Sequence, residues 1–170
     1  MRRFVLSNGL TVLVESRKSD SVAVEVSVGV GSNFESKRQR GLSHFLEHVL
    51  FDGSSKRQSA FELSNAVEKL GGELNGGTSN EQTCFYAKVP SKHFEVALDV
   101  LSDMLLKPLL RREDVEKERK VVLNEIQLYT DDPKLHIWVL LQKHLYVKHP
   151  ARNPVYGRAE TIAKFTRRDV

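Results

Sequence analysis

The sequence has 170 residues, a length that favours a single domain large enough to bury a hydrophobic core. Hydrophobic residues make up 40% of it and charged residues 28%, as in an ordinary soluble globular protein. The formal charge is +4, but the basic residues are mixed with acidic ones and form no aromatic-interleaved stripe, which argues against nucleic-acid binding.

The N-terminal region is predicted to form a β-hairpin followed by a strand. In residues 2–16, two β-rich runs flank Asn8-Gly9, the strongest short hairpin signal. The same polar break interrupts the apolar stretch, so these residues are not expected to be a signal peptide. Residues 22–30 alternate apolar and polar side chains as a half-buried strand does, and the polar residues 31–41 are expected to be a loop.

Two helices and two strands are predicted next. The first helix covers residues 42–51. Ser59 and Glu62 have the spacing of a capping box that begins a second helix, and Gly71 is placed to end it. Two strands joined by a polar turn around Asn80 follow.

The rest of the sequence is predicted to be mainly helical. Pro108 separates two amphipathic helices, a further helix follows, and "HPARNPVYG" is a loop; the helices cover residues 91–106, 112–130 and 133–146. Thr166 and Asp169 have the spacing of a helix cap with its first turn. A helix that stops as it begins suggests a domain that is incomplete at its C-terminus.

The order of elements is strands, helices, strands and helices. It favours an α+β fold, with a largely antiparallel or mixed sheet packed against several helices, over a parallel βαβ arrangement. No apolar run is long enough to span a membrane. Cys84 is the single cysteine, which we interpret as a small strand residue rather than a catalytic thiol. Together these features predict a cytoplasmic protein.

The stretch "GLSHFLEHVLF" places polar groups on an otherwise apolar helix. His44 and His48 are four residues apart and lie within about 40° of each other on a helical wheel, with Glu47 beside them. Burying two imidazoles and a carboxylate together is costly unless something compensates. A divalent metal would compensate, and this reading is favoured over two separate, hydrogen-bonded histidines.

A third ligand is expected, because catalytic zinc sites usually have three protein ligands. On the helix at 112–130, Glu118 and Glu125 are seven residues apart and lie beside the apolar face. Either could face the histidine helix. The alternative for one such glutamate is an inward carboxylate paired with an internal Arg or Lys.

Residues 44–48 read H-x-x-E-H, the inverted zinc motif of the inverzincins. With this motif the chain resembles the family of pitrilysin, insulin-degrading enzyme and mitochondrial processing peptidase, most nearly its bacterial, processing-peptidase-like branch. Segments throughout the chain resemble family segments in family order: "FVLSNGLTVLVE", "GLSHFLEHVLFDGSSKR", "VEKLGGELNGGTSNEQTCFYAKV", "ERKVVLNEIQLYTDDP" and "NPVYGRAETIAKFTRRDV".

The resemblance implies a role for each residue of the motif. His44, His48 and the distal Glu125 would bind Zn²⁺, one ion per chain. Glu47 would be the general base that takes a proton from water and returns it to the leaving amine. Glu118 matches a family glutamate that supports catalysis.

The resemblance also implies a substrate-binding strand. Asn75 matches a residue near the substrate, and Gly76, Gly77 and Thr78 form an edge to which a peptide or unfolded protein adds as another strand. The family usually has Ala where this chain has Gly76, which is expected to loosen the edge.

The implied function is that of a zinc-dependent endopeptidase. Family domains continue with a further helix and strand, and a homologous second half, a partner subunit or a second copy completes the substrate clamp. Residues 1–170 are therefore expected to be a single, incomplete N-terminal zinc-binding peptidase domain, whose activity in isolation is open. The alternatives are a hydrolase of non-peptide substrates, and an inactive fragment or non-peptidase subunit of the same fold that binds zinc or a partner chain.

Overall fold

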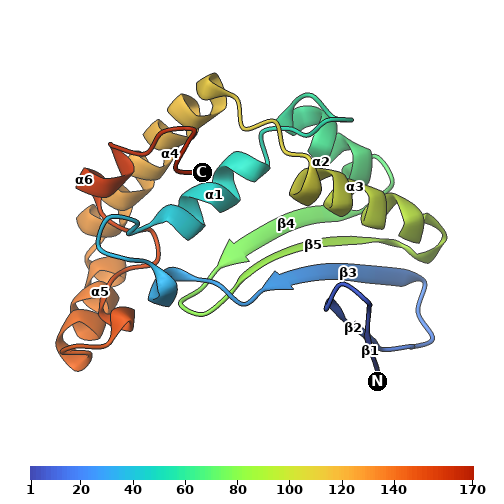
Figure 1. Ribbon diagram of the computed structural model, residues 1–170, viewed down its shortest axis with the longest axis horizontal. Coiled ribbons are helices and arrows are strands. Elements are labelled where there is room, and N and C mark those ends of the chain that lie inside the picture. Colours follow the sequence, from blue (N-terminus) through green and yellow to red (C-terminus); the bar gives the residue numbers. More distant parts are fainter.

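The computed structural model describes all 170 residues as an α+β arrangement (Figure 1). Its strands are β1 (Arg2–Val5), β2 (Thr11–Val14), β3 (Ser21–Val28), β4 (Glu73–Thr78) and β5 (Thr83–Pro90). Its helices are α1 (Leu42–Leu50), α2 (Ala60–Glu68), α3 (Phe94–Leu106), α4 (Arg112–Asp131), α5 (Pro133–Leu145) and the short α6 (Ala159–Ile162). Single 3₁₀ turns lie at Ser32–Phe34, Ser91–His93 and Pro150–Arg152.

The central sheet has three antiparallel strands in the order β3-β5-β4. In β5 the side chains alternate strictly, so that Thr83, Phe85, Ala87 and Val89 are buried while the residues between them are not. The buried face packs against α1, α2 and α3 (Figure 1). An antiparallel sheet with helices on one face confirms the predicted fold class.

The predicted N-terminal hairpin is also confirmed, but it lies outside the central sheet. Strands β1 and β2 pair only with each other, and Gly9 at their turn has a φ of 86°, which favours glycine. The hairpin's apolar side chains stay largely exposed, among them Val5, Leu10 and Leu13. The hairpin therefore has no buried apolar face in this chain.

Two hydrophobic clusters hold the helices, and α1 contributes to both. The larger cluster joins α1, α2, α3 and β5, with Leu50 as the contribution of α1. The second cluster joins α1, α4 and the C-terminal segment around Phe45, Val49, Val122 and Phe165. Helix α1 is therefore fixed between the sheet on one side and α4 on the other.

Most predicted helix boundaries are confirmed. The Ser59 side chain accepts a hydrogen bond from the Glu62 N–H at 3.2 Å, and Gly71 follows α2 with a φ of 76°. At the C-terminus the prediction was wrong in part. The Thr166 N–H and hydroxyl both donate to the Asp169 carboxylate and close a turn there, and the short α6 that precedes this turn was not predicted. No helix combines the length and apolar character needed to cross a bilayer.

Candidate metal centre

The start of α1 is fixed by close backbone packing. Gly41 precedes the helix with a φ of 91°, and a Cβ at this position would lie 2.7 Å from the Tyr156 carbonyl oxygen. The Glu35 carboxylate accepts hydrogen bonds from the backbone N–H groups of Gly41 and Ser43, each at 2.8 Å. This capping carboxylate satisfies donors at the helix N-terminus, so the turn that carries His44 has a defined position.

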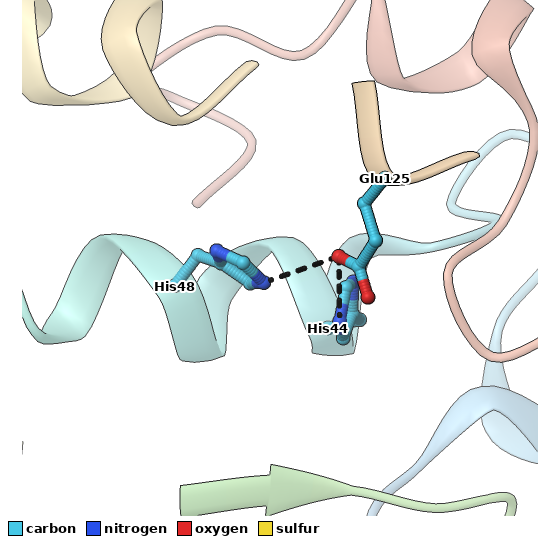
Figure 2. A group of neighbouring side chains, drawn as sticks. All are labelled: His44, His48 and Glu125. Atoms are coloured by element: carbon cyan, nitrogen blue, oxygen red, sulfur yellow. Dashed lines mark ion pairs between the residues drawn. The ribbon is translucent and has the colours of Figure 1, made fainter. Parts of the chain in front are cut away.

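Helices α1 and α4 bring the three predicted ligands together. His44 and His48 project from successive turns of α1, and Glu125 reaches them from α4 (Figure 2). The Glu125 Oε2 atom lies 3.5 Å from His44 Nε2 and 3.6 Å from His48 Nε2. The three residues can each offer a ligand atom within 4.8 Å of the others, although 77 positions separate His48 from Glu125 in the sequence.

The arrangement fits a metal ion better than it fits a hydrogen-bonded cluster. Glu125 Oε2 is buried and has no hydrogen-bond partner, and Glu125 pairs with no Lys or Arg. Ligand bonds of about 2.0–2.1 Å in a tetrahedral site would separate the ligand atoms by about 3.4 Å, close to the observed spacing. Two imidazole nitrogens and one carboxylate oxygen are a donor set typical of a zinc site with one open position.

Glu118 lies behind His48 rather than in the ligand set. Its Oε2 atom is 3.1 Å from His48 Nδ1, the ring nitrogen that faces away from Glu125. A hydrogen bond there selects the tautomer that leaves Nε2 available for a ligand bond. The outer nitrogen of His44, by contrast, is buried without a partner.

Lys117, an exposed side chain of α4, connects Glu118 to Asp52. Its ammonium group lies 3.1 Å from Glu118 Oε1 and also pairs with Asp52, whose side chain is almost fully buried. Glu118 is therefore paired both with His48 and with a cation, but Lys117 is exposed and is not the internal Lys or Arg that the alternative required. The Asp52–Lys117–Glu118–His48 contacts join the end of α1 to α4.

The side chains of the candidate site shift one another's pKa values even without a metal ion. The hydrogen bond to Glu118 and the nearby Glu125 carboxylate raise the pKa of His48 to about 9, whereas burial lowers the pKa of His44. The neighbouring His48 and His44 in turn lower the pKa of Glu125. Burial acts to raise the pKa of Glu118, but His48 and Lys117 bring it below its usual value. Both glutamates are thus held as carboxylates, the form that a cation requires.

Glu47 lies on the same helix but contacts the sheet. Its Oε2 atom accepts a hydrogen bond of 2.5 Å from the Thr78 hydroxyl at the end of β4. The chain gives Glu47 no other hydrogen-bond or ion-pair partner, so its second oxygen is free. Thr78 was predicted to lie at a substrate edge, and its hydroxyl is instead hydrogen-bonded to Glu47.

The rest of the predicted substrate edge lies on β4, which pairs only with β5. The Asn75 side chain accepts a hydrogen bond from the Gly76 N–H at 2.8 Å. A Cβ at Gly76 would lie 3.1 Å from the rings of Phe51 and Phe85, and one at Gly77 would meet nothing within 4 Å. Gly76 therefore allows close packing against α1, and the outer edge of β4 has no partner strand in this chain.

Four residues around the site were not predicted from the sequence: Glu35, Asp52, Lys117 and Tyr156. Their contacts depend on chain segments far apart in the sequence, and each residue is polar in a region that reads as loop or solvated helix. Only Asp52 gave a partial signal. It is a charged residue directly after the apolar run of α1, but a charged residue there is ordinarily expected at a surface.

Comparison with known proteins gives consistent matches over most of the chain. Residues 10–159 match the family described as Insulinase (Peptidase family M16). The sequence is 39% identical over 166 residues to a Bacillus subtilis protein named as the uncharacterized zinc protease YmxG, covering 97% of this chain and 40% of that protein. It is 36% identical to an Arabidopsis thaliana protein named as a probable mitochondrial-processing peptidase subunit beta, covering 97% of this chain and 31% of that protein.

Solved structures match the fold in the same way. A protease from Helicobacter pylori superimposes with a TM-score of 0.93 at 27% identity, covering 99% of this chain and 41% of that one. Pitrilysin superimposes with a TM-score of 0.79 at 28% identity, covering 94% of this chain and 17% of that one. The chain thus spans about 40% or less of the length of these relatives.

Proposed function

This chain belongs to the insulinase family of peptidases, and from that premise we propose that it carries the metal-binding and proton-transferring residues of a zinc-dependent endopeptidase. The observation that supports the proposal most directly is the meeting of His44, His48 and Glu125 around one buried, unpartnered carboxylate oxygen. Curated relatives from several bacteria are named zinc proteases.

In this proposal His44 and His48 hold one zinc ion through Nε2, and Glu125 holds it through Oε2. When bound, zinc supplies a Lewis acid that polarises the scissile carbonyl and makes water easier to deprotonate at neutral pH. Glu118 keeps the His48 ring in its ligating tautomer and orientation through Nδ1. Its role is to position a ligand, because it touches none of the reacting atoms.

Glu47 is the proposed general base. One carboxylate oxygen is held by Thr78, and the other is free to take a proton from the attacking water and to return it to the leaving amine. The adjacent β4 edge is the proposed binding place for an extended peptide, which would pair with it as an additional strand. Asn75, Gly76 and Gly77 line this edge, as does the backbone of Thr78.

We further propose that residues 1–170 act as one zinc-binding peptidase domain together with a homologous second half or partner subunit, or within a homodimer. The relatives are at least about 2.5 times as long as this chain, which leaves room for such a partner. Hydrolysis is therefore best measured with this domain both alone and fused to the part of a full-length relative that lies outside the matched region.

The test compares zinc content and peptide hydrolysis in two single variants. Glu47→Gln is expected to keep one zinc per chain and to lose hydrolysis by a factor of at least about 100, because only the proton acceptor is removed. Glu125→Gln is expected to lose zinc as well as activity, because a ligand is removed. Zinc is measured by metal analysis after dialysis and hydrolysis with a quenched fluorescent peptide.

Gln127→Glu is a suitable control, since Gln127 is an exposed residue of α4 outside the site. It should change neither zinc content nor turnover. A fully active Glu47→Gln protein would contradict the assignment of the base. Unchanged zinc content in Glu125→Gln would place the third ligand elsewhere, and zinc binding without any turnover would favour the non-catalytic alternative.

A further inference from the structure

The hydroxyl of Thr78 connects the candidate peptide edge to the candidate base. Thr78 is the last residue of β4 and pairs with Thr83 of β5. Along β4 the side chains of Leu74 and Thr78 point to the helix side of the sheet, as a Cβ at Gly76 would, because alternate residues share a face. Thr78 therefore meets α1 at the position of Glu47.

The backbone that carries Thr78 is held by contacts on both sides. The turn after it is closed by a hydrogen bond of 2.8 Å from the Ser79 N–H to the Gln82 carbonyl. The N–H groups of Ser32 and Asn33 donate to the carbonyls of Ser79 and Asn80, at 3.2 and 2.8 Å. A β-branched side chain on such a backbone has few rotamers, so the direction of the Thr78 hydroxyl is well defined.

Glu47, by contrast, depends on this contact for its placement. The glutamate has three rotatable side-chain bonds and only half-buried surroundings, and the Thr78 hydroxyl is its single polar partner in the chain. Without that donor, its carboxylate would sample several rotamers. A base displaced by about 1 Å can lose a factor of about 100 in rate.

We propose that Thr78 is a positioning residue that holds the Glu47 carboxylate in its reactive orientation through the 2.5 Å hydrogen bond at the end of β4. The inference rests on the proposed function of Glu47, which it deepens. It assigns the Thr78 side chain to the base and leaves only the Thr78 backbone for pairing with a peptide. Strand β4 would thus align the substrate and the base as one unit.

Peptide hydrolysis by the zinc-loaded, fused protein is the first test. Thr78→Val removes the donor while keeping the shape, and kcat should fall about 10–100-fold with KM within about twofold. Zinc content should be unchanged, because Thr78 touches no ligand. Thr78→Ser restores a donor and should recover kcat to within about threefold of the starting protein.

Thr83→Val is the matched control. Thr83 is the cross-strand partner of Thr78. Its hydroxyl donates to the Val30 carbonyl at 3.0 Å and does not reach Glu47. Its kcat should stay within about twofold of the starting value. A Thr78→Val protein with unchanged kcat, or an equal loss in Thr83→Val, would overturn the proposal.

A double-mutant cycle without zinc tests the contact independently of catalysis. Unfolding by urea is measured for the unmodified chain, Thr78→Val, Glu47→Ala and the double variant. A hydrogen bond to a charged group predicts a coupling of about tenfold in the unfolding equilibrium constant. Additive effects would overturn the inference. If the unmodified protein neither binds zinc nor hydrolyses peptide, the proposed function is wrong. The double-mutant cycle still shows whether Thr78 and Glu47 interact.

Discussion

At the scale of single residues, the two histidines of the site have different surroundings. His48 has a carboxylate against each ring nitrogen, and Glu118 is in turn paired with Lys117. His44 has Glu125 on one nitrogen and no partner on the other. The orientation of His48 is therefore specified by side chains, whereas that of His44 depends on its fixed position in the first turns of α1.

This difference predicts an effect of Glu118→Gln on metal affinity. The amide keeps the shape but loses the negative charge that holds the Nδ1 proton, so zinc affinity should fall about 10–100-fold. Competition with a chromophoric chelator measures it. Glu116→Gln, an exposed carboxylate on the same helix, is the matched control. An affinity within twofold of the unmodified chain would show that Glu118 does not support the ligand.

At the scale of elements, one aspartate of α3 fixes the segment that follows α1. The buried Asp103 carboxylate accepts hydrogen bonds from the Ser54 and Ser55 hydroxyls, at 2.5 and 2.8 Å, and from the Lys56 N–H at 3.1 Å. Burial acts to raise the pKa of Asp103, but these donors and the Arg57 charge hold it below its usual value. The segment after α1 is thus tied to α3 by one ionised group.

The lowered pKa of Asp103 predicts how Asp103→Asn changes stability with pH. A carboxyl group whose pKa is lower in the folded state stabilises the fold above its unfolded pKa of about 3.9 and loses this effect as the pH falls through the folded value. Asp103→Asn should therefore cost about 2 kcal/mol in the free energy of unfolding at pH 7, and progressively less below about pH 4.

Urea unfolding of both proteins at pH 7 and at successive pH values below 4 measures this difference. Asp99→Asn is the control, because Asp99 pairs with Lys56 and Arg57 at the surface and should contribute less than about 1 kcal/mol. A cost for Asp103→Asn that does not change with pH would show that the carboxylate form is not what stabilises the segment.

At the scale of the whole molecule, helix α1, which carries both histidines of the candidate metal centre, takes part in both hydrophobic clusters. Helix α1 carries Leu50 into the cluster beneath the sheet, and Phe45 and Val49 into the cluster shared with α4. Of the two clusters, only the second joins α1 to α4, and so the candidate ligands His44 and His48 to Glu125. Packing changes in the two clusters should therefore have different consequences for metal binding.

Two core substitutions of similar size test this separation. Phe45→Leu and Leu101→Val should each lower the free energy of unfolding by about 1–1.5 kcal/mol, since both side chains are fully buried. Only Phe45→Leu should also weaken zinc binding, by about 3–10-fold, because it loosens the contact between α1 and α4. Equal zinc affinities in the two variants would contradict a separate role for the second cluster.

Much of the local structure was predictable from sequence. Asn8-Gly9, the Ser59–Glu62 capping box and the alternation in residues 22–30 each specify an element through interactions within a few residues. The spacing of His44 and His48 placed both on one helical side for the same reason. The short α6 shows the limit, because no local signal predicted it and its Ile162 packs into the second cluster.

The sequence by itself determined the chemistry of this protein: a pair of histidines on one side of a helix, a glutamate between them and two inward glutamates on another helix. It left open which glutamate faces the histidines, and that choice came only from the resemblance. Only the tertiary structure decided that Glu125 meets both Nε2 atoms, that Glu118 stands behind His48 and that Thr78 holds Glu47. The physical reason is that helical periodicity fixes only the side of a helix on which a residue lies. Which sides of two helices face each other is fixed by the packing of α1 between the sheet and α4.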